Sequence, residues 1–132
     1  MSSTILEAKP NAAGGKISTL QPDDGWTNVC RVDDLVKNSG VCVLFEHQQV
    51  ALFYIGKPLT VYAIANYDPF SNANVLSRGI TGSLQDRVVV ASPIFKQHFC
   101  LVSGVCLEDN SVSVAVFPSR IHGDHVQLKS PG

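Results

Sequence analysis

The stretch GVCVLFEHQQVALFYIGKPLTVYAIA, residues 40–65, decides the fold class. It contains three runs rich in Val, Ile, Phe and Tyr, at 40–46, 50–55 and 59–65, and these residue types favour extended strands. EHQQ and GKP separate the runs and have the composition of turns. Strands joined by such short connections have to lie antiparallel, because a parallel crossover needs about a dozen residues or more.

The same pattern continues toward the C-terminus in RVVVAS (87–92), HFCLVS (98–103) and VSVAVFP (112–118). Only VDDLVKNSG, residues 32–40, could form a helical turn, with an Asp as its cap and a Gly as its stop. Gly123-Asp124, between two histidines, predicts a hairpin tip. We therefore predict an all-β domain, an antiparallel sandwich or small barrel.

Residues 1–24 contain Gly and Pro and almost no periodic apolar pattern, so we expect a flexible N-terminal tail. Residues 25–132 are then one domain, in keeping with a chain of 132 residues. With 45% apolar and 16% charged residues the sequence is typical of a globular protein rather than a disordered one.

The charge balance excludes strongly basic function classes. Ten Lys and Arg against eleven Asp and Glu give a net charge of −1, so we expect no nucleic-acid partner. We find no signal peptide in the first ten residues and no apolar stretch of membrane-spanning length, and expect a cytoplasmic protein with no membrane contact. Four cysteines without a paired CxxC pattern are expected to be free thiols.

Candidate chemistry in the sequence is sparse. No G-x-S-x-G turn is present to hold a catalytic serine. In KQHFCLVSG, residues 96–104, His98 and Cys100 would point to the same face of a strand. Cys106 could join them as a metal ligand only if the chain turned back sharply at Gly104, and the spacing does not favour a metal site. An enzyme with thiol chemistry at Cys100 or Cys106 is one alternative.

Two longer stretches carry a resemblance. NYDPFSNANVLSRG (66–79) and VVVASPIFKQHFCLVSG (88–104) resemble the two boxes of Rieske iron–sulfur proteins, C-x-H before L-S-x-G and C-P-x-H before F-x-x-x-[ST]-G. The resemblance places the four cluster-ligand positions at Pro69, Ser71, Ser92 and Phe95. None of these is Cys or His, the residue types that bind a Rieske cluster. The resemblance therefore implies a Rieske-like fold with a two-loop former cluster-binding subdomain and no cluster or metal.

Over residues 26–128 the sequence resembles, among Rieske-like families, the small subunits of assimilatory NAD(P)H-dependent nitrite reductase. This resemblance implies a non-catalytic subunit that docks on a large subunit. The large subunit would carry FAD, an iron–sulfur cluster and siroheme and would reduce nitrite to ammonia. The alternative within the same fold is a free-standing Rieske-type ferredoxin, an electron carrier with atypical ligands.

The two former cluster loops, around Phe70 to Arg78 and Phe95 to Gln97, are the expected docking surface, because loops on a rigid scaffold often mediate recognition. We expect Phe70, Arg78, Lys96 and Gln97 to contact the partner. Phe95 occupies a ligand position and is expected to fill the space of the missing cluster, whereas the sequence leaves open whether Phe70 is an interface anchor or a filler.

Overall fold

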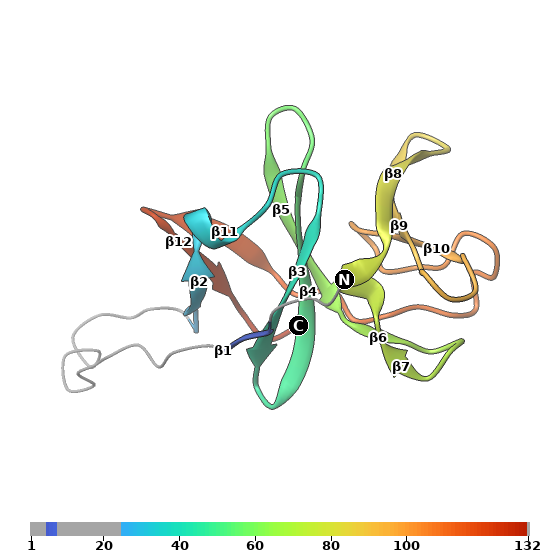
Figure 1. Ribbon diagram of the computed structural model, residues 1–132, viewed down its shortest axis with the longest axis horizontal. Helices are drawn as coiled ribbons and strands as arrows, with labels where there is room; N and C mark the ends of the chain where they lie inside the picture. The colour runs from blue at the N-terminus through green and yellow to red at the C-terminus, as the bar shows by residue number, and fades with distance from the viewer. Residues whose placement is uncertain (1–4, 8–24, 132) are drawn as a thin grey trace.

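The computed structural model describes residues 5–7 and 25–131, which form an all-β domain, as the sequence predicts. A central sheet has the strand order β1-β3-β4-β5, and Figure 1 shows the sheet β11-β12-β2 on one side of it and the sheet β10-β9-β8 on the other. Strands β6 and β7 form a two-stranded sheet. The strands are β1 Ile5–Glu7, β2 Thr27–Arg31, β3 Gly40–Phe45, β4 Gln48–Ile55, β5 Thr60–Ala65, β6 Tyr67–Asp68, β7 Ala73–Asn74, β8 Ile80–Leu84, β9 Arg87–Ala91, β10 His98–Cys100, β11 Ser119–His122 and β12 His125–Leu128; two 3-10 helices are η1 Val32–Asp34 and η2 Leu76–Arg78.

Strand β4 separates two hydrophobic cores, which explains its unbroken run of aliphatic and aromatic residues from Val50 to Ile55. Val50 and Leu52 point into one core, together with Phe117 and side chains of β2, β3 and β12. Ala51 and Phe53 point to the opposite face, into a second core with β9 and β10. Because successive residues of a strand face opposite sides, a strand buried on both faces has to be apolar at every position.

The predicted run at 112–118 is not a strand in the structure. This segment makes isolated bridges, Ile64↔Val116 and Val105↔Ser113, to two different parts of the chain. The amide of Phe117 also donates to the Ala63 carbonyl at 2.9 Å. The segment divides its hydrogen bonds between two neighbours, so no continuous ladder forms with either.

Most of strand β8 lies in RGITGS, residues 78–83, whose Gly, Ser and Thr content is typical of a turn. Gln85 and Asp86, with φ of 54° and 63°, form a two-residue loop that joins β8 to β9. Two consecutive residues with positive φ are the signature of a type I′ hairpin turn. Strand β8 escaped sequence detection because it is exposed and carries few apolar residues.

The predicted tail contributes one element to the described structure. Strand β1, Ile5–Glu7, pairs in parallel with β3, in the register Ile5↔Cys42 to Glu7↔Leu44. The sequence pattern did not predict this strand. The rest of the predicted flexible tail, residues 1–4 and 8–24, lies outside the described residues.

Candidate functional site

The two former cluster loops leave neighbouring parts of the fold. Pro69 and Ser71 lie in the turn between β6 and β7, and Ser92 and Phe95 lie in the segment between β9 and β10. Each loop is closed on itself by main-chain hydrogen bonds, since the Asn72 amide donates to the Asp68 carbonyl and the Ser92 amide donates to the Gln97 carbonyl. The loops are therefore ordered by their own backbone.

A buried carboxylate, Asp68, joins the two loops. The hydroxyls of Ser71 and Ser92 donate to its Oδ2 at 2.9 and 2.6 Å, and the amide of Phe70 donates to its Oδ1 at 2.9 Å. Asp68 and Ser92 are both fully buried. Because the two serines come from different loops, this one side chain connects the loops at the positions where the Rieske resemblance places metal ligands.

The residues at those positions do not fit a [2Fe-2S] cluster. A Rieske cluster needs two thiolates and two imidazoles, and Pro69 and Phe95 offer no donor atom. Both serine hydroxyls already donate to Asp68. Over the described residues, no group of three or more His, Cys, Asp or Glu is placed to hold a metal ion.

The two phenylalanines of these loops differ in burial, and only Phe95 departs from what the sequence suggested. Phe95 was expected to fill the space of the cluster, but 57% of it is exposed, so that expectation is wrong. Phe70 is half-buried instead, and its ring lies 6.1 Å from the ring of Phe99 in the second core. In a Rieske protein the ligand at this position has to point at the cluster, whereas a loop residue that binds no metal is free to point toward solvent. The exposed apolar surface of this loop is Ile94 and Phe95.

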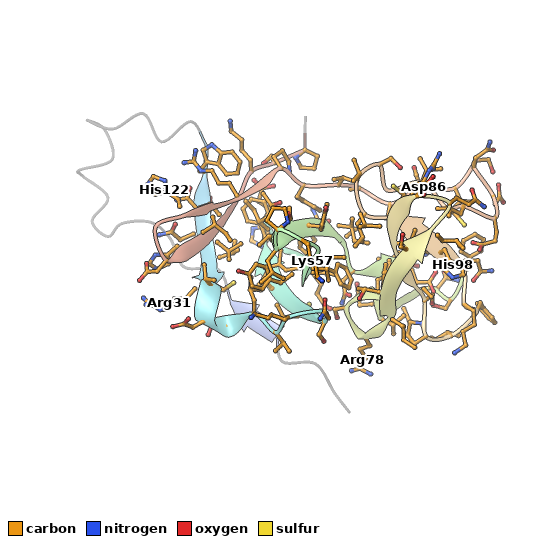
Figure 2. All side chains as sticks on the ribbon, turned by 90° about the horizontal axis from the view of Figure 1, so that it is seen from above. Arg31, Lys57, Arg78, Asp86, His98 and His122 are labelled. Atoms are coloured by element: carbon orange, nitrogen blue, oxygen red, sulfur yellow. The ribbon has the colours of Figure 1, made fainter. Side chains whose placement is uncertain are left out.

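The three polar residues expected to contact a partner differ in their surroundings. Arg78 ends η2 and is exposed, and Figure 2 shows its side chain pointing away from the body of the domain. Lys96 is exposed and its Nζ donates to the Pro93 carbonyl at 3.3 Å. Gln97 is partly buried, and its Oε1 accepts no hydrogen bond within the part of the chain that the structure describes. Arg78 is thus the most available of the three.

A buried side-chain amide, Asn66, which no sequence motif singled out, anchors the turn η2 that carries Arg78. Asn66 Oδ1 accepts the amide of Ser77 at 2.7 Å, and Asn66 Nδ2 donates to Gln49 Oε1 at 2.9 Å. Asn66 and Asp68 come from the same NYDP sequence, where two polar residues follow directly on the apolar β5. Buried polar residues at a strand end are the signal that could have identified both.

The stretch around His98 does turn back sharply at Gly104, whose φ is +79°. A Cβ on Gly104 would lie 2.1 Å from the Val114 carbonyl oxygen, so only glycine fits this turn. The turn pairs Cys106 with Phe99, and paired residues point to the same face. Cys106 therefore lies on the core side with Phe99. Its Sγ donates to Glu108 Oε1 at 3.6 Å, and among the described residues it forms no metal-ligand set with His98 and Cys100.

His98 has a carboxylate partner instead of a metal. Its Nδ1 lies 2.6 Å from Glu108 Oε2, and its amide donates to Glu108 Oε1 at 2.7 Å. Desolvation raises the pKa of Glu108, but the hydrogen bonds from the His98 amide and ring together lower it by more, so the pKa lies below its ordinary value. Cys100 and Cys106 are 5% and 0% exposed, which gives thiol chemistry at either residue little access to a substrate.

The helical segments of the described chain are three-residue turns, and none has the length or apolar character to cross a membrane.

A family model described as a Rieske-like [2Fe-2S] domain matches residues 25–129. The nitrite reductase (NADH) small subunit of Salmonella typhimurium is 43% identical over 104 residues, which cover 79% of this chain and 96% of the relative. The solution NMR structure of the nitrite reductase [NAD(P)H] small subunit from Erwinia carotovora is 47% identical with a TM-score of 0.68, and the match covers 82% of this chain and 83% of that one. The nitrite reductase [NAD(P)H] large subunit of Klebsiella oxytoca is 32% identical over 117 residues, which are 89% of this chain but 12% of that protein.

Proposed function

The chain belongs to the family of nitrite reductase small subunits, and we propose that it is the small, non-catalytic subunit of an NAD(P)H-dependent nitrite reductase. In this proposal it docks on a large subunit in the cytoplasm. The large subunit carries FAD, an iron–sulfur cluster and siroheme and reduces nitrite to ammonia. The observation that carries the proposal is the 43% identity to a small subunit along 96% of its length.

The relationship to the Klebsiella oxytoca protein supports the large subunit as the partner. There, the segment similar to this chain is a minor part of a much longer chain that is itself named the large subunit. Covalent linkage holds two modules at a high effective concentration. A separate small subunit needs a docking surface to reach the same arrangement.

The residues of the former cluster site favour a structural role for this chain over an electron-carrying one. Asp68, Ser71 and Ser92 form a closed hydrogen-bonded set where a Rieske carrier would place thiolate and imidazole ligands. Iron analysis of the chain purified from iron-replete cells tests this point. We expect a colourless protein without stoichiometric iron, whereas a visible absorption that bleaches on reduction would restore the ferredoxin alternative.

The docking surface in this proposal is the pair of former cluster loops with Phe70, Arg78, Lys96 and Gln97. Arg78 is exposed and offers a rigid fork of donors, a residue type common among interface hot spots. Phe70 is half-buried and packs its ring against Phe99 beneath the loop, while Ile94 and Phe95 add exposed apolar area next to Lys96.

A binding titration against purified large subunit tests the docking surface. We expect Arg78→Ala to weaken binding about thirtyfold, which corresponds to about 2 kcal/mol for a hot-spot residue. Lys129→Ala is the control, because Lys129 follows β12 in the sheet on the opposite side of the central sheet (Figure 1). If Arg78→Ala and Phe70→Ala both bind like wild type while circular dichroism shows folded protein, the partner docks elsewhere. Nitrite reduction measured with and without this chain tests the subunit role itself.

A further inference from the structure

Among the residues that the structure describes, strand β8 is an edge strand that pairs with β9 on one side and with no strand on the other. The sheet order is β10-β9-β8, and the register of the β8–β9 hairpin runs from Ile80↔Ala91 to Leu84↔Arg87. In a hairpin with a two-residue loop the closing pair is hydrogen-bonded, and bonded and non-bonded pairs then alternate. The N–H and C=O groups of Thr81 and Ser83 therefore point away from β9. Within the described chain, no backbone hydrogen bond outside the ladder uses them.

This edge lacks the features that usually protect one. The sequence ITGSL contains no Lys and no Pro, the residues that commonly discourage further strand pairing. A Cβ added at Gly82 would meet no atom within 4 Å. Ile80 is 77% exposed and Leu84 is 37% exposed. The Thr81 hydroxyl donates to the Asn38 carbonyl at 3.4 Å, which is the side-chain hydrogen bond that an extended chain entering along β8 would have to accommodate.

A groove runs along the same edge. One cavity of about 520 Å³ lies between β8 and the end of β4, lined by Ile55, Gly56 and residues 79–83 among others. A second, of about 500 Å³, shares Asn38 and Gly56 with the first and continues along 56–59. Figure 1 shows the β4–β5 and β8–β9 hairpins projecting in the same direction, and the lining residues place the groove between them.

Positive charge is concentrated at one end of the groove. Lys37 and Lys57 line the second cavity, and neither cavity is lined by Asp or Glu. Asp86 lies at the tip of the β8–β9 hairpin, and Figure 2 shows it well separated from Lys57. An extended chain in the groove would be stabilised by an acidic side chain at the lysine end.

We propose that this groove receives an extended, acidic segment of the large subunit, which adds to β8 as a further strand. Main-chain hydrogen bonds to Thr81 and Ser83 would supply affinity, and the lysines would select a segment with a carboxylate at that end. This inference rests on the proposed function, since it names a second contact of the same partner. It differs from the docking loops because its hydrogen bonds come from main-chain groups of β8, while the lysine side chains contribute selectivity.

Amide hydrogen exchange of the chain, alone and bound to purified large subunit, tests the strand addition. In the free chain the amides of Thr81 and Ser83 should exchange quickly, and those of Gly82 and Leu84 slowly, because only the latter donate to β9. Binding should slow Thr81 and Ser83 at least about tenfold, as expected for amides that acquire a main-chain acceptor. If both amides are already protected in the free chain, the edge is covered by this chain itself or by a second copy, and the proposal is wrong.

A matched pair of variants separates backbone from side-chain recognition. Ser83→Pro removes an outward N–H and should weaken binding about tenfold or more, whereas Ser83→Ala keeps the N–H and should bind within about twofold of wild type. Circular dichroism checks that Ser83→Pro folds, and the exchange experiment on the wild-type chain decides the question if it does not. The double change Lys37→Glu and Lys57→Glu should also weaken binding about tenfold, and less so at high salt; Lys129→Glu is its control.

Two negative results are distinguishable. If the wild-type chain fails to bind the large subunit, the proposed function fails and this inference fails with it. If the wild-type chain binds, but Thr81 and Ser83 stay fast and Ser83→Pro binds like wild type, the strand addition is refuted and the subunit role stands.

Discussion

Replacing Asp68 should separate the two former cluster loops from each other. Asp68→Ala removes the acceptor of three hydrogen bonds, from the Phe70 amide and from the Ser71 and Ser92 hydroxyls. Ser92 is fully buried, so its hydroxyl cannot turn to water. Each buried group left without a partner costs about 1–3 kcal/mol. Because the three contacts share one side chain and are not additive, we expect a total loss of about 3–5 kcal/mol in the free energy of unfolding.

The asparagine variant provides a graded comparison. Asp68→Asn keeps the volume and one acceptor oxygen. Its NH₂ group replaces either Oδ2, to which two hydroxyls now donate, or Oδ1, to which the Phe70 amide donates. Hydroxyls can rotate and accept instead, so the expected loss is about 1–2 kcal/mol. The exposed Asp33 in η1 makes no such contacts, and Asp33→Ala should change stability by less than about 0.5 kcal/mol.

Urea unfolding followed by circular dichroism measures the three differences. Amide exchange should also show residues 69–74 and 92–97 opening in Asp68→Ala before the rest of the domain does. A loss below about 1 kcal/mol in Asp68→Ala would mean that this carboxylate does not hold the loops together, and the structural account of the former cluster site would be wrong.

Three further predictions follow from individual residues. His98 lowers the pKa of Glu108, so the stability that their pairing provides is present above the ordinary glutamate pKa and is lost as the pH falls through the lowered value. Glu108→Gln should flatten this part of an acid-unfolding curve, and an unchanged curve would contradict the pairing. Burial raises the pKa of Cys30 to about 12, so iodoacetamide at pH 8 should leave this thiol unmodified until urea is added, and stoichiometric labelling of the folded chain would contradict its burial. Gly104→Ala should lower the free energy of unfolding by more than about 2 kcal/mol, because Gly104 has a positive φ and no room for a Cβ. Gly82→Ala, where a Cβ meets no atom, should lower it by less than about 0.5 kcal/mol. Equal effects would refute the turn geometry.

The sequence by itself determined the fold class and the absence of Rieske ligand types. The alternation and spacing of the runs at 40–65 depend on local composition, and β3, β4 and β5 were predicted to within two residues of their observed bounds. The identity of the residues at Pro69, Ser71, Ser92 and Phe95 can likewise be read from aligned motifs without coordinates. These features were predictable because strand propensity and side-chain chemistry belong to each residue and its nearest neighbours.

Only the tertiary structure decided what occupies the positions where the Rieske resemblance places ligands, and which surfaces of the described residues remain open. The bond from Ser92 to Asp68 joins residues 24 positions apart, and no local pattern specifies it. The same holds for Phe70 packing on Phe99 while Phe95 stays exposed, and for the free edge of β8. Each of these depends on which distant segment arrives beside a residue, and therefore on the packing of both cores around β4, a property of the whole chain rather than of any stretch within it.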